Sequence, residues 1–307
     1  MKLAEKTSFS GRLGNTLLDL LDRRLLDDGA SLYSLIDGAR FSRLVRMVSA
    51  QNASIELFSL LGEAAATDAV YAGPILIRHK TREQCDLLLK LMGEQDSASF
   101  MSLIISAQPL AEILKRLVWL TEVRHEDGTE WIMRFYDPLI LPHWLAVLDA
   151  KQRQQALSGT LQWLFTDVRG ENQAVDVASG DFAPLLETRP MLLMEQQSDD
   201  LMTAAMPYIV MHQLCGDNPQ ALDAIPSTER YDFFYRQIES AKKLDVAASG
   251  DVKMFCLLAT MFGPEFSKHP LISIAAQGVD SGYSFCESVL AWTSEQWDLL
   301  EKELSPL

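Results

Sequence analysis

The pattern of hydrophobic and polar positions divides the chain into two parts. Up to about residue 170, short apolar runs typical of β-strands alternate with segments whose apolar residues recur every three or four positions, as on one face of an α-helix. The expected strands are 31–38, 54–60, 73–79, 99–106, 117–125, 129–137 and 161–169, and the expected helices are 17–27, 40–50, 82–93, 110–117 and 142–157. This alternation predicts an α/β lobe, a mixed sheet with flanking helices, over residues 1–170.

Beyond residue 170 the pattern changes. Residues 171–187 are polar and rich in small side chains, which favours a linker, and residues 188–307 show only helical periodicity. We therefore predict an all-α C-terminal lobe over 188–307. Ser227 is a candidate cap for the helix over 228–244, and Thr293 with Gln296 forms a capping-box pattern before the last helix.

The segment 131–138, Trp-Ile-Met-Arg-Phe-Tyr-Asp-Pro, follows Asp127-Gly128, a pair that predicts a β-hairpin between 117–125 and 129–137. Arg134 lies within this expected strand, where burial would be costly without a carboxylate partner, and Asp37 or Asp137 could supply it. Asp137 and Pro138 also suit the cap and the first position of a helix, so a structural role for Asp137 is favoured over a catalytic one.

The charge balance narrows the choice of partners. The chain has 27 Lys and Arg against 42 Asp and Glu, a formal net charge of −15, so we expect neither nucleic acid nor an anionic membrane as a partner. The N-terminal stretch lacks the apolar core of a signal peptide, and no apolar run is long enough to span a bilayer. We expect a cytoplasmic protein whose four separated cysteines are mostly buried thiols.

Motifs for catalysis, metal binding or phosphate binding are missing from the sequence, so we expect no cofactor and no metal site. The patterns GxGxxG, GxxxxGK[ST], GxSxG and HExxH do not occur, and the five histidines are isolated. His79 follows an expected strand and is the best candidate for an alternative hypothesis, an α/β enzyme with its site at strand ends near His79 and Asp37 or Asp137.

Four segments together resemble the adaptors, or chaperones, of type VI secretion effectors. These segments keep the order and spacing of that family across about residues 30–168, and they are LYSLIDGAR (32–40), AGPILIRH (72–79), SLIISAQPLAEILKRL (102–117) and RFYDP (134–138). The resemblance implies that Asp37, Arg134, Phe135, Tyr136, Asp137 and Pro138 form a structural signature of the domain.

The resemblance also implies a function without catalysis. Such adaptors bind a toxic effector in the producing cell and load it onto the VgrG spike protein, so a cognate effector and VgrG are the expected partners of a chain that is monomeric when free. Partner binding calls for an exposed patch with aromatic anchors. The candidates lie on one stripe of the helix over 228–244 and are Tyr231, Phe234, Tyr235 and Ile238; packing of this stripe within the lobe's own core is the alternative.

Overall fold

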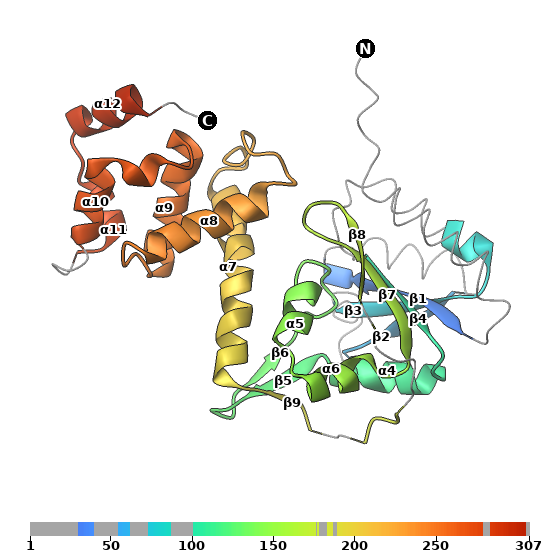
Figure 1. The fold of residues 1–307 in the computed structure, drawn as a ribbon. Helices are drawn as coiled ribbons and strands as arrows, with labels where there is room; N and C mark the ends of the chain where they lie inside the picture. The colour runs from blue at the N-terminus through green and yellow to red at the C-terminus, as the bar shows by residue number, and fades with distance from the viewer. Residues whose placement is uncertain are drawn as a thin grey trace, which may run out of the picture. The chain divides into compact units, whose positions relative to one another are not determined.

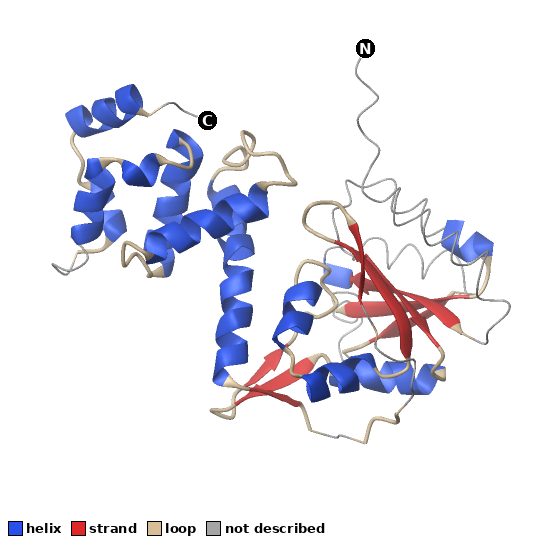
Figure 2. Ribbon diagram, in the orientation of Figure 1, coloured by secondary structure: helices blue, strands red, loops and turns tan. Residues whose placement is uncertain are grey.

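The computed structural model describes residues 30–39, 55–61, 73–86, 101–175, 177, 183–186, 189–278 and 283–304. The chain divides into two compact units, Met1–Leu201 and Met202–Leu307, called here the sheet unit and the helical unit. The described residues of the sheet unit form two β-sheets with flanking helices, and those of the helical unit contain helices and connecting loops (Figures 1 and 2). The predicted fold class is therefore confirmed.

The larger sheet has six strands in the order β2-β3-β1-β4-β7-β8. The strands are β1 (Ser31–Asp37), β2 (Glu56–Ser59), β3 (Pro74–His79), β4 (Met101–Ser106), β7 (Thr160–Thr166) and β8 (Asn172–Val175). All neighbouring strands of this sheet run antiparallel. Residues on both faces of the central β1 are buried, which explains why its sequence carries apolar residues at consecutive positions instead of alternating with polar ones.

The smaller sheet has three strands in the order β6-β5-β9. Its strands are β5 (Glu122–His125), β6 (Glu130–Ile132) and β9 (Met191–Leu193). β5 and β6 form the predicted hairpin, and Gly128 in its turn has φ 86°, a conformation that favours glycine. β9 runs parallel to β5, so the sheet unit combines antiparallel and parallel pairing.

Three helices of the sheet unit share one core with the larger sheet. They are α4 (Leu110–Trp119), α5 (Leu141–Val147) and α6 (Ala150–Leu157), and Figure 1 shows them beside the strands. The strand register places Tyr33, Ile104 and Trp163 side by side on one face of the sheet. These side chains are buried in one cluster with Leu117 of α4 and Trp144 of α5. The amphipathic pattern of the helices therefore serves to cover this face.

The structure differs from the sequence prediction at the end of the sheet unit. The expected linker over 171–187 includes β8, which pairs with β7, and the expected helical lobe from 188 begins with β9. Along the chain, the boundary between the two compact units falls within α7 (Glu195–Asp217), between Leu201 and Met202. The helices expected over 17–27 and 40–50 lie outside the described residues.

The helical unit comprises most of α7 and five further α-helices among the described residues. They are α8 (Arg230–Lys242), α9 (Ser249–Phe262), α10 (Pro270–Gln277), α11 (Phe285–Leu290) and α12 (Ser294–Glu303), with a short 3-10 helix, η2 (Phe266–Lys268), before α10. The predicted capping box of Thr293 and Gln296 is present at α12, and Gly263 ends α9 with φ 87°. Ser227 is not the cap of α8, because this helix begins at Arg230 and its N-cap residue is Glu229.

Candidate functional site

The candidate residues of the sheet unit meet in one ion-pair cluster. Nη2 of Arg134 lies 2.6 Å from Oδ2 of Asp37 and 3.3 Å from Oδ2 of Asp137. Both carboxylate partners considered from the sequence are thus in contact with the guanidinium. The two acids are buried, with the Asp37 side chain only 1% exposed, whereas the Arg134 side chain is 48% exposed. Arg134 thereby covers two buried negative charges and still contacts solvent.

The sequence predicts a strand over 129–137 that includes Arg134, but in the structure Arg134 lies outside any strand. β6 ends at Ile132, and the backbone N–H of Asp137 donates to the carbonyl of Arg134 in a turn. A second turn follows, in which the N–H of Ile140 donates to the carbonyl of Asp137 and Pro138 occupies the position that this residue prefers in turns. Two consecutive turns therefore replace the last part of the expected strand.

Asp137 is also not the N-cap of the following helix. Its Oδ1 accepts a hydrogen bond of 3.0 Å from the N–H of Leu139, within the turn, and α5 begins only at Leu141. Pro142 then falls in the first turn of α5, where its missing N–H leaves no hydrogen bond unmade. The two prolines, Pro138 and Pro142, thus serve two separate elements, a turn and a helix start.

The remaining residues of the segment anchor it in the core. Phe135 is fully buried, and its ring lies 5.7 Å from that of Trp144 and 6.1 Å from that of Trp163, measured between centroids. Tyr136 is buried beside it, and the guanidinium of Arg134 lies 6.0 Å from the centre of the Tyr136 ring, at the limit of a cation–π contact. The segment Arg134–Pro138 thus combines an aromatic anchor with a charge pair.

The electrostatics of this cluster suit a structural tie. Burial alone would lower the pKa of Arg134, but the charges of Asp37 and Asp137 outweigh it and hold this pKa above its usual value. The guanidinium therefore stays protonated at any physiological pH and cannot act as an acid or base. Breaking a pair with a buried partner leaves an uncompensated charge, which costs about 3 kcal/mol of folding free energy. We interpret the cluster of Arg134, Asp37 and Asp137 as stabilising the fold of the sheet unit.

His79, the candidate for the enzymatic alternative, is a buried side chain of β3. Its Nε2 lies 2.8 Å from Oγ of Ser34, and its Nδ1 has no hydrogen-bond partner among the described residues. Burial lowers the pKa of His79 from 6.5 to about 4, so the imidazole is neutral at pH 7. The register pairs His79 with Leu32, on the opposite face of the sheet from the one that includes Tyr33, Leu35 and Asp37. His79 and Asp37 therefore do not converge.

The aromatic stripe expected on α8 is divided by the structure. Phe234 and Ile238 are 0% and 3% exposed and belong to the core of the helical unit, so they are corrected from partner-binding candidates to core residues. Tyr235 is 41% exposed and Tyr231 is half-buried. A helix stripe wider than the buried seam places its edge residues at the surface, and only these two tyrosines reach it.

A third tyrosine joins these two, and the sequence analysis missed it. Tyr208 of α7 lies 5.0 Å from Tyr231 between ring centroids, and Tyr231 lies 6.2 Å from Tyr235 with nearly parallel rings. We call Tyr208, Tyr231 and Tyr235 the tyrosine row. Burial raises the pKa of Tyr231 to about 12, with smaller contributions from Tyr235 and Asp232, so its hydroxyl stays neutral and donates to the carbonyl of Ala204. No sequence signal links Tyr208 to α8, because the contact is between helices.

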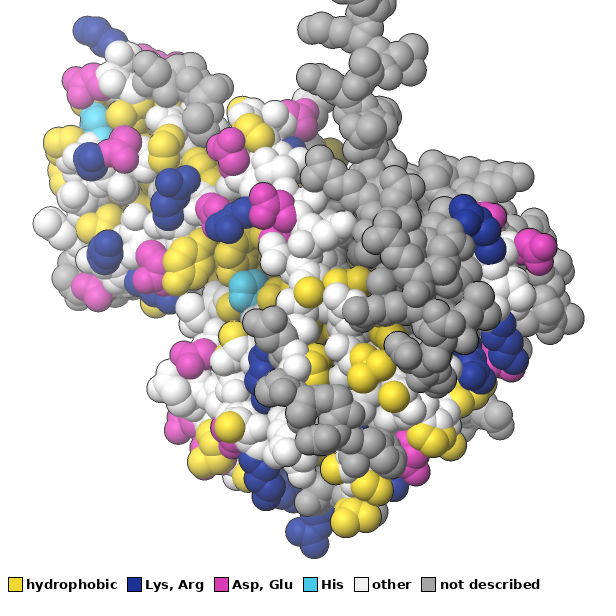
Figure 3. All heavy atoms as spheres, turned by 45° about the vertical axis from the view of Figure 1, so that its right-hand side comes forward, with side chains coloured by type: hydrophobic (Ala, Val, Ile, Leu, Met, Phe, Trp, Pro, Cys, Tyr) yellow, Lys and Arg dark blue, Asp and Glu magenta, His cyan; other side chains and the backbone are white. Residues whose placement is uncertain are grey.

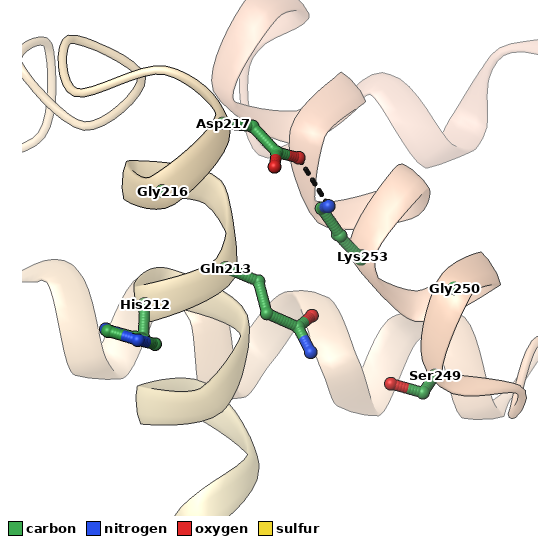
Figure 4. Close-up of a pocket in the computed structure, with 7 residues that line it drawn as sticks. All are labelled: His212, Gln213, Gly216, Asp217, Ser249, Gly250 and Lys253. Atoms are coloured by element: carbon green, nitrogen blue, oxygen red, sulfur yellow. Dashed lines mark ion pairs between the residues drawn. The ribbon is translucent and has the colours of Figure 1, made fainter.

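An open hollow of about 640 Å³ lies between α7 and α9 of the helical unit (Figure 4). Lys253 and Asp217 form an ion pair across it. Its other lining residues are mostly polar or glycine, and they are His212, Gln213, Gly216, Ser249 and Gly250. The ion pair neutralises the charges of Lys253 and Asp217 against each other.

Further features of the described residues that bear on function are their metal-ligating groups, the length and hydropathy of their helices, their cysteines and their surface charge. In the part of the chain that the structure describes, no three His, Cys, Asp or Glu side chains gather as a metal ion requires, and no helix is long and apolar enough to cross a membrane. Cys85 and Cys256 are buried, as expected, whereas Cys215 and Cys286 are partly exposed. Figure 3 shows basic and acidic side chains interspersed on one face, with hydrophobic patches between them.

Comparison with known proteins gives one match. The family model described as "Domain of unknown function (DUF4123)" matches residues 32–155. This match includes all three residues of the ion-pair cluster, and it covers less than half of the chain. Domains of this family are associated with effector adaptors of type VI secretion systems. Nothing matches the chain among the curated proteins or among the solved structures.

Proposed function

We propose that this chain is a type VI secretion adaptor that binds a cognate toxic effector in the cytoplasm of the producing cell and loads it onto the VgrG spike, without catalysis. The observation that carries the proposal is the match of residues 32–155 to a domain family associated with such adaptors. The site geometry supports it, because Arg134 pairs with two buried acids and His79, the candidate catalytic histidine, is buried.

The tyrosine row is the proposed contact surface of the helical unit. Tyrosine is enriched at the centres of interfaces because it supplies a large apolar area together with a polar hydroxyl. Stacking already restricts the rings of Tyr208, Tyr231 and Tyr235, so a partner would order them at little further entropic cost. Met202, 44% exposed on α7, adds another apolar side chain to the same unit.

The charge of the chain favours a protein partner with a basic surface. The helical unit carries 14 Asp and Glu against 7 Lys and Arg, and the sheet unit carries the remaining 28 against 20, so both units are acidic. Long-range attraction between opposite charges raises association rates and falls with added salt. We therefore expect binding to the effector to weaken as the salt concentration rises.

The test is co-expression of the full chain with the product of the adjacent downstream gene and with the neighbouring spike protein. We expect the chain to co-purify with these proteins and to run as a monomer on size-exclusion chromatography when alone. Replacing both Tyr231 and Tyr235 with Ala should weaken binding by about thirtyfold, the size of an interface hot spot. Tyr283→Ala is the matched control, because Tyr283 is an exposed tyrosine of the same unit outside the row.

Two results would overturn the proposal. If the wild-type chain retains neither protein, its function is not that of an adaptor. If the chain binds them but Tyr283→Ala weakens binding as much as the double variant, the tyrosine row is not the contact surface. Thermal unfolding of each variant shows whether the helical unit remains folded, and we expect it to, because Tyr235 and Tyr283 are exposed and Tyr231 is only half-buried.

A further inference from the structure

One edge of the smaller sheet, β6, presents backbone groups that point away from the sheet. Among the strands that the structure describes, β6 is an edge strand and pairs only with β5. The N–H of His125 donates to the carbonyl of Thr129, and the N–H of Met133 donates to the carbonyl of Thr121, both at 2.8 Å. In an antiparallel ladder such bonded pairs alternate with unbonded ones, so the N–H and C=O groups of Glu130 and Ile132 point away from β5.

The side chains of this edge are apolar and exposed. Trp131 is 46% exposed and Ile132 is 65% exposed, and they lie on opposite faces of the sheet because successive strand residues alternate. Trp131 packs against the ring of His125, 3.7 Å away between centroids, which holds the indole at the edge. Exposed apolar side chains on an edge strand are a liability that soluble proteins normally avoid.

One edge of the larger sheet, β8, shows the usual protection. Among the described strands, β8 pairs only with β7. The N–H of Asp167 donates to the carbonyl of Glu171, so the alternation leaves the N–H groups of Asn172 and Ala174 pointing outward. The outward and neighbouring residues of β8 are Asn172, Gln173 and Ala174, which offer no large apolar side chain. Of these two edges, β8 carries no large apolar side chain, whereas β6 presents Trp131 and Ile132.

The charge around β6 indicates what kind of segment fits there. The hairpin over 122–132 has one arginine, Arg124, against four acids, which are Glu122, Glu126, Asp127 and Glu130. Hydrogen bonds from the side chain and the N–H of Thr129 hold the pKa of Asp127 below its usual value, so this group stays ionised. The edge therefore attracts lysine and arginine.

The outward backbone groups, the exposed apolar side chains and the acids all lie at or next to β6. From this combination we propose that β6 is a docking edge on which an extended, basic segment of the partner protein adds as a fourth strand of the smaller sheet. The inference rests on the proposed adaptor function and names the chemistry of one contact. The outward N–H and C=O groups of Glu130 and Ile132 require the paired geometry of a strand, which a helix cannot supply. Trp131 and Ile132 contact alternate side chains of that strand, and the acids contact its basic residues.

Backbone docking is tested by removing one outward N–H group. Ile132→Pro deletes that donor and leaves the bonds to β5 intact, since proline is tolerated on edge strands where the N–H faces solvent. Ile132→Ala removes the side chain and keeps the donor. With the product of the adjacent downstream gene as the probe, we expect Ile132→Pro to weaken binding by about tenfold more than Ile132→Ala does.

The matched control is Ala174→Pro, which deletes an outward N–H from the protected edge β8 and should leave binding unchanged. Glu130→Lys should weaken binding and reduce its dependence on salt. Hydrogen exchange of the Glu130 and Ile132 amides should slow at least about tenfold in the complex, because both become bonded. Circular dichroism of each variant confirms that the sheet unit remains folded.

The outcomes separate this inference from the proposed function. If the wild-type chain binds neither the downstream product nor the spike protein, both the function and the docking edge are wrong. If the wild-type chain binds but Ile132→Pro and Ile132→Ala bind equally well, or the two amides exchange at the free rate in the complex, the adaptor function stands and the docking edge is wrong. A loss of binding in Ala174→Pro equal to that in Ile132→Pro would also overturn the inference.

Discussion

The two units bury their polar groups differently. Among the described residues, the sheet unit buries many polar or charged side chains, including Asp37, His79 and Arg116, whereas the helical unit buries Gln237, Asp251 and His269. The core of the helical unit is instead built on phenylalanines, which are Phe233, Phe234, Phe255, Phe262, Phe266 and Phe285. Both units therefore have an apolar core, and the sheet unit adds more buried polar side chains to its own.

The difference follows from where backbone groups find their partners. A helix satisfies most of its N–H and C=O groups internally, so packed helices need few polar side chains between them. The loops of the sheet unit have carbonyls that need donors from elsewhere. Arg116 of α4 donates to the carbonyls of Gln155 and Ala183, and Lys115 donates to that of Leu185. Polar side chains of α4, one buried and one exposed, thus hold the segment 183–186 and the end of α6 to this helix.

The largest effect is expected in the apolar core of the helical unit. Phe234→Ala should lower the free energy of unfolding of this unit by about 4 kcal/mol, because a fully buried ring leaves a cavity. Tyr235→Ala, one residue along α8, should lower it by about 1 kcal/mol or less, since that ring is partly exposed. Urea unfolding, followed by the fluorescence of Trp292 and Trp297 near this core, measures both.

Equal losses in Phe234→Ala and Tyr235→Ala would contradict the division of the α8 stripe into core and surface. The proposed partner contact through the tyrosine row depends on that division. A further variant, Ile238→Ala, should resemble Phe234→Ala with a smaller loss, about 3 kcal/mol, because its side chain is equally buried but smaller.

The α8 stripe illustrates what the sequence could predict. Helical periodicity identified α8 and α12, and it also grouped Tyr231 with Phe234 on one face, because both properties depend on residues close in sequence. Periodicity cannot say where the buried seam ends on that face. That limit depends on how α7 and α9 pack, a contact between distant parts of the chain.

The sheet unit shows the same limit more strongly. The Asp127-Gly128 hairpin is local and was predicted, whereas β9 has only three residues and pairs with a strand about 70 positions earlier. The position of β1 between β3 and β4 also depends on distant pairing. The contact of Arg134 with Asp37 could be suggested because both residue types were known to need partners, but its geometry came from two turns that the apolar run had concealed.

Acid should weaken the sheet unit through His79. The pKa of this imidazole is about 4 in the folded state and 6.5 as the ordinary value, so below pH 6.5 the unfolded chain takes up a proton that the folded unit excludes. The stabilisation is complete above pH 6.5 and is lost progressively as the pH falls to about 4. The loss amounts to about 3 kcal/mol at pH 4.

The measurement is urea unfolding of the wild type and of His79→Gln between pH 7 and pH 4, followed by hydrogen exchange of the β1 and β3 amides. Glutamine can still reach Ser34 but does not titrate, so the wild type should lose about 3 kcal/mol more than the variant over this range. Parallel pH profiles would show that His79 is protonated in the folded unit. That result would mean that His79 is not an example of a neutral buried polar side chain that sets the sheet unit apart from the helical unit.

Substitutions of two glycines are expected to change stability less than those of Phe234 or the titration of His79. They extend the comparison of the sheet unit with the helical unit, because the two units use glycine for different reasons. Gly159 in the sheet unit has φ 70°, and an added Cβ would clash with the buried side chain of Gln108, which donates to the carbonyl of Ser158. Gly159→Ala should therefore cost about 2 kcal/mol. Gly216 near the end of α7 has no heavy atom within 4 Å of such a Cβ, apart from its own helix backbone and chain neighbours.

Gly216→Ala should stabilise the helical unit by about 0.5 kcal/mol, because alanine restricts the unfolded chain and favours the helix. Thermal unfolding of the two alanine variants should thus give shifts of opposite sign. The contrast has a physical origin, since the backbone of the sheet unit turns tightly against Gln108 at Gly159, whereas Gly216 faces the open hollow between α7 and α9. Destabilisation by Gly216→Ala would mean that the hollow is closed by the chain itself, and the helical unit would then share the tight backbone packing of the sheet unit.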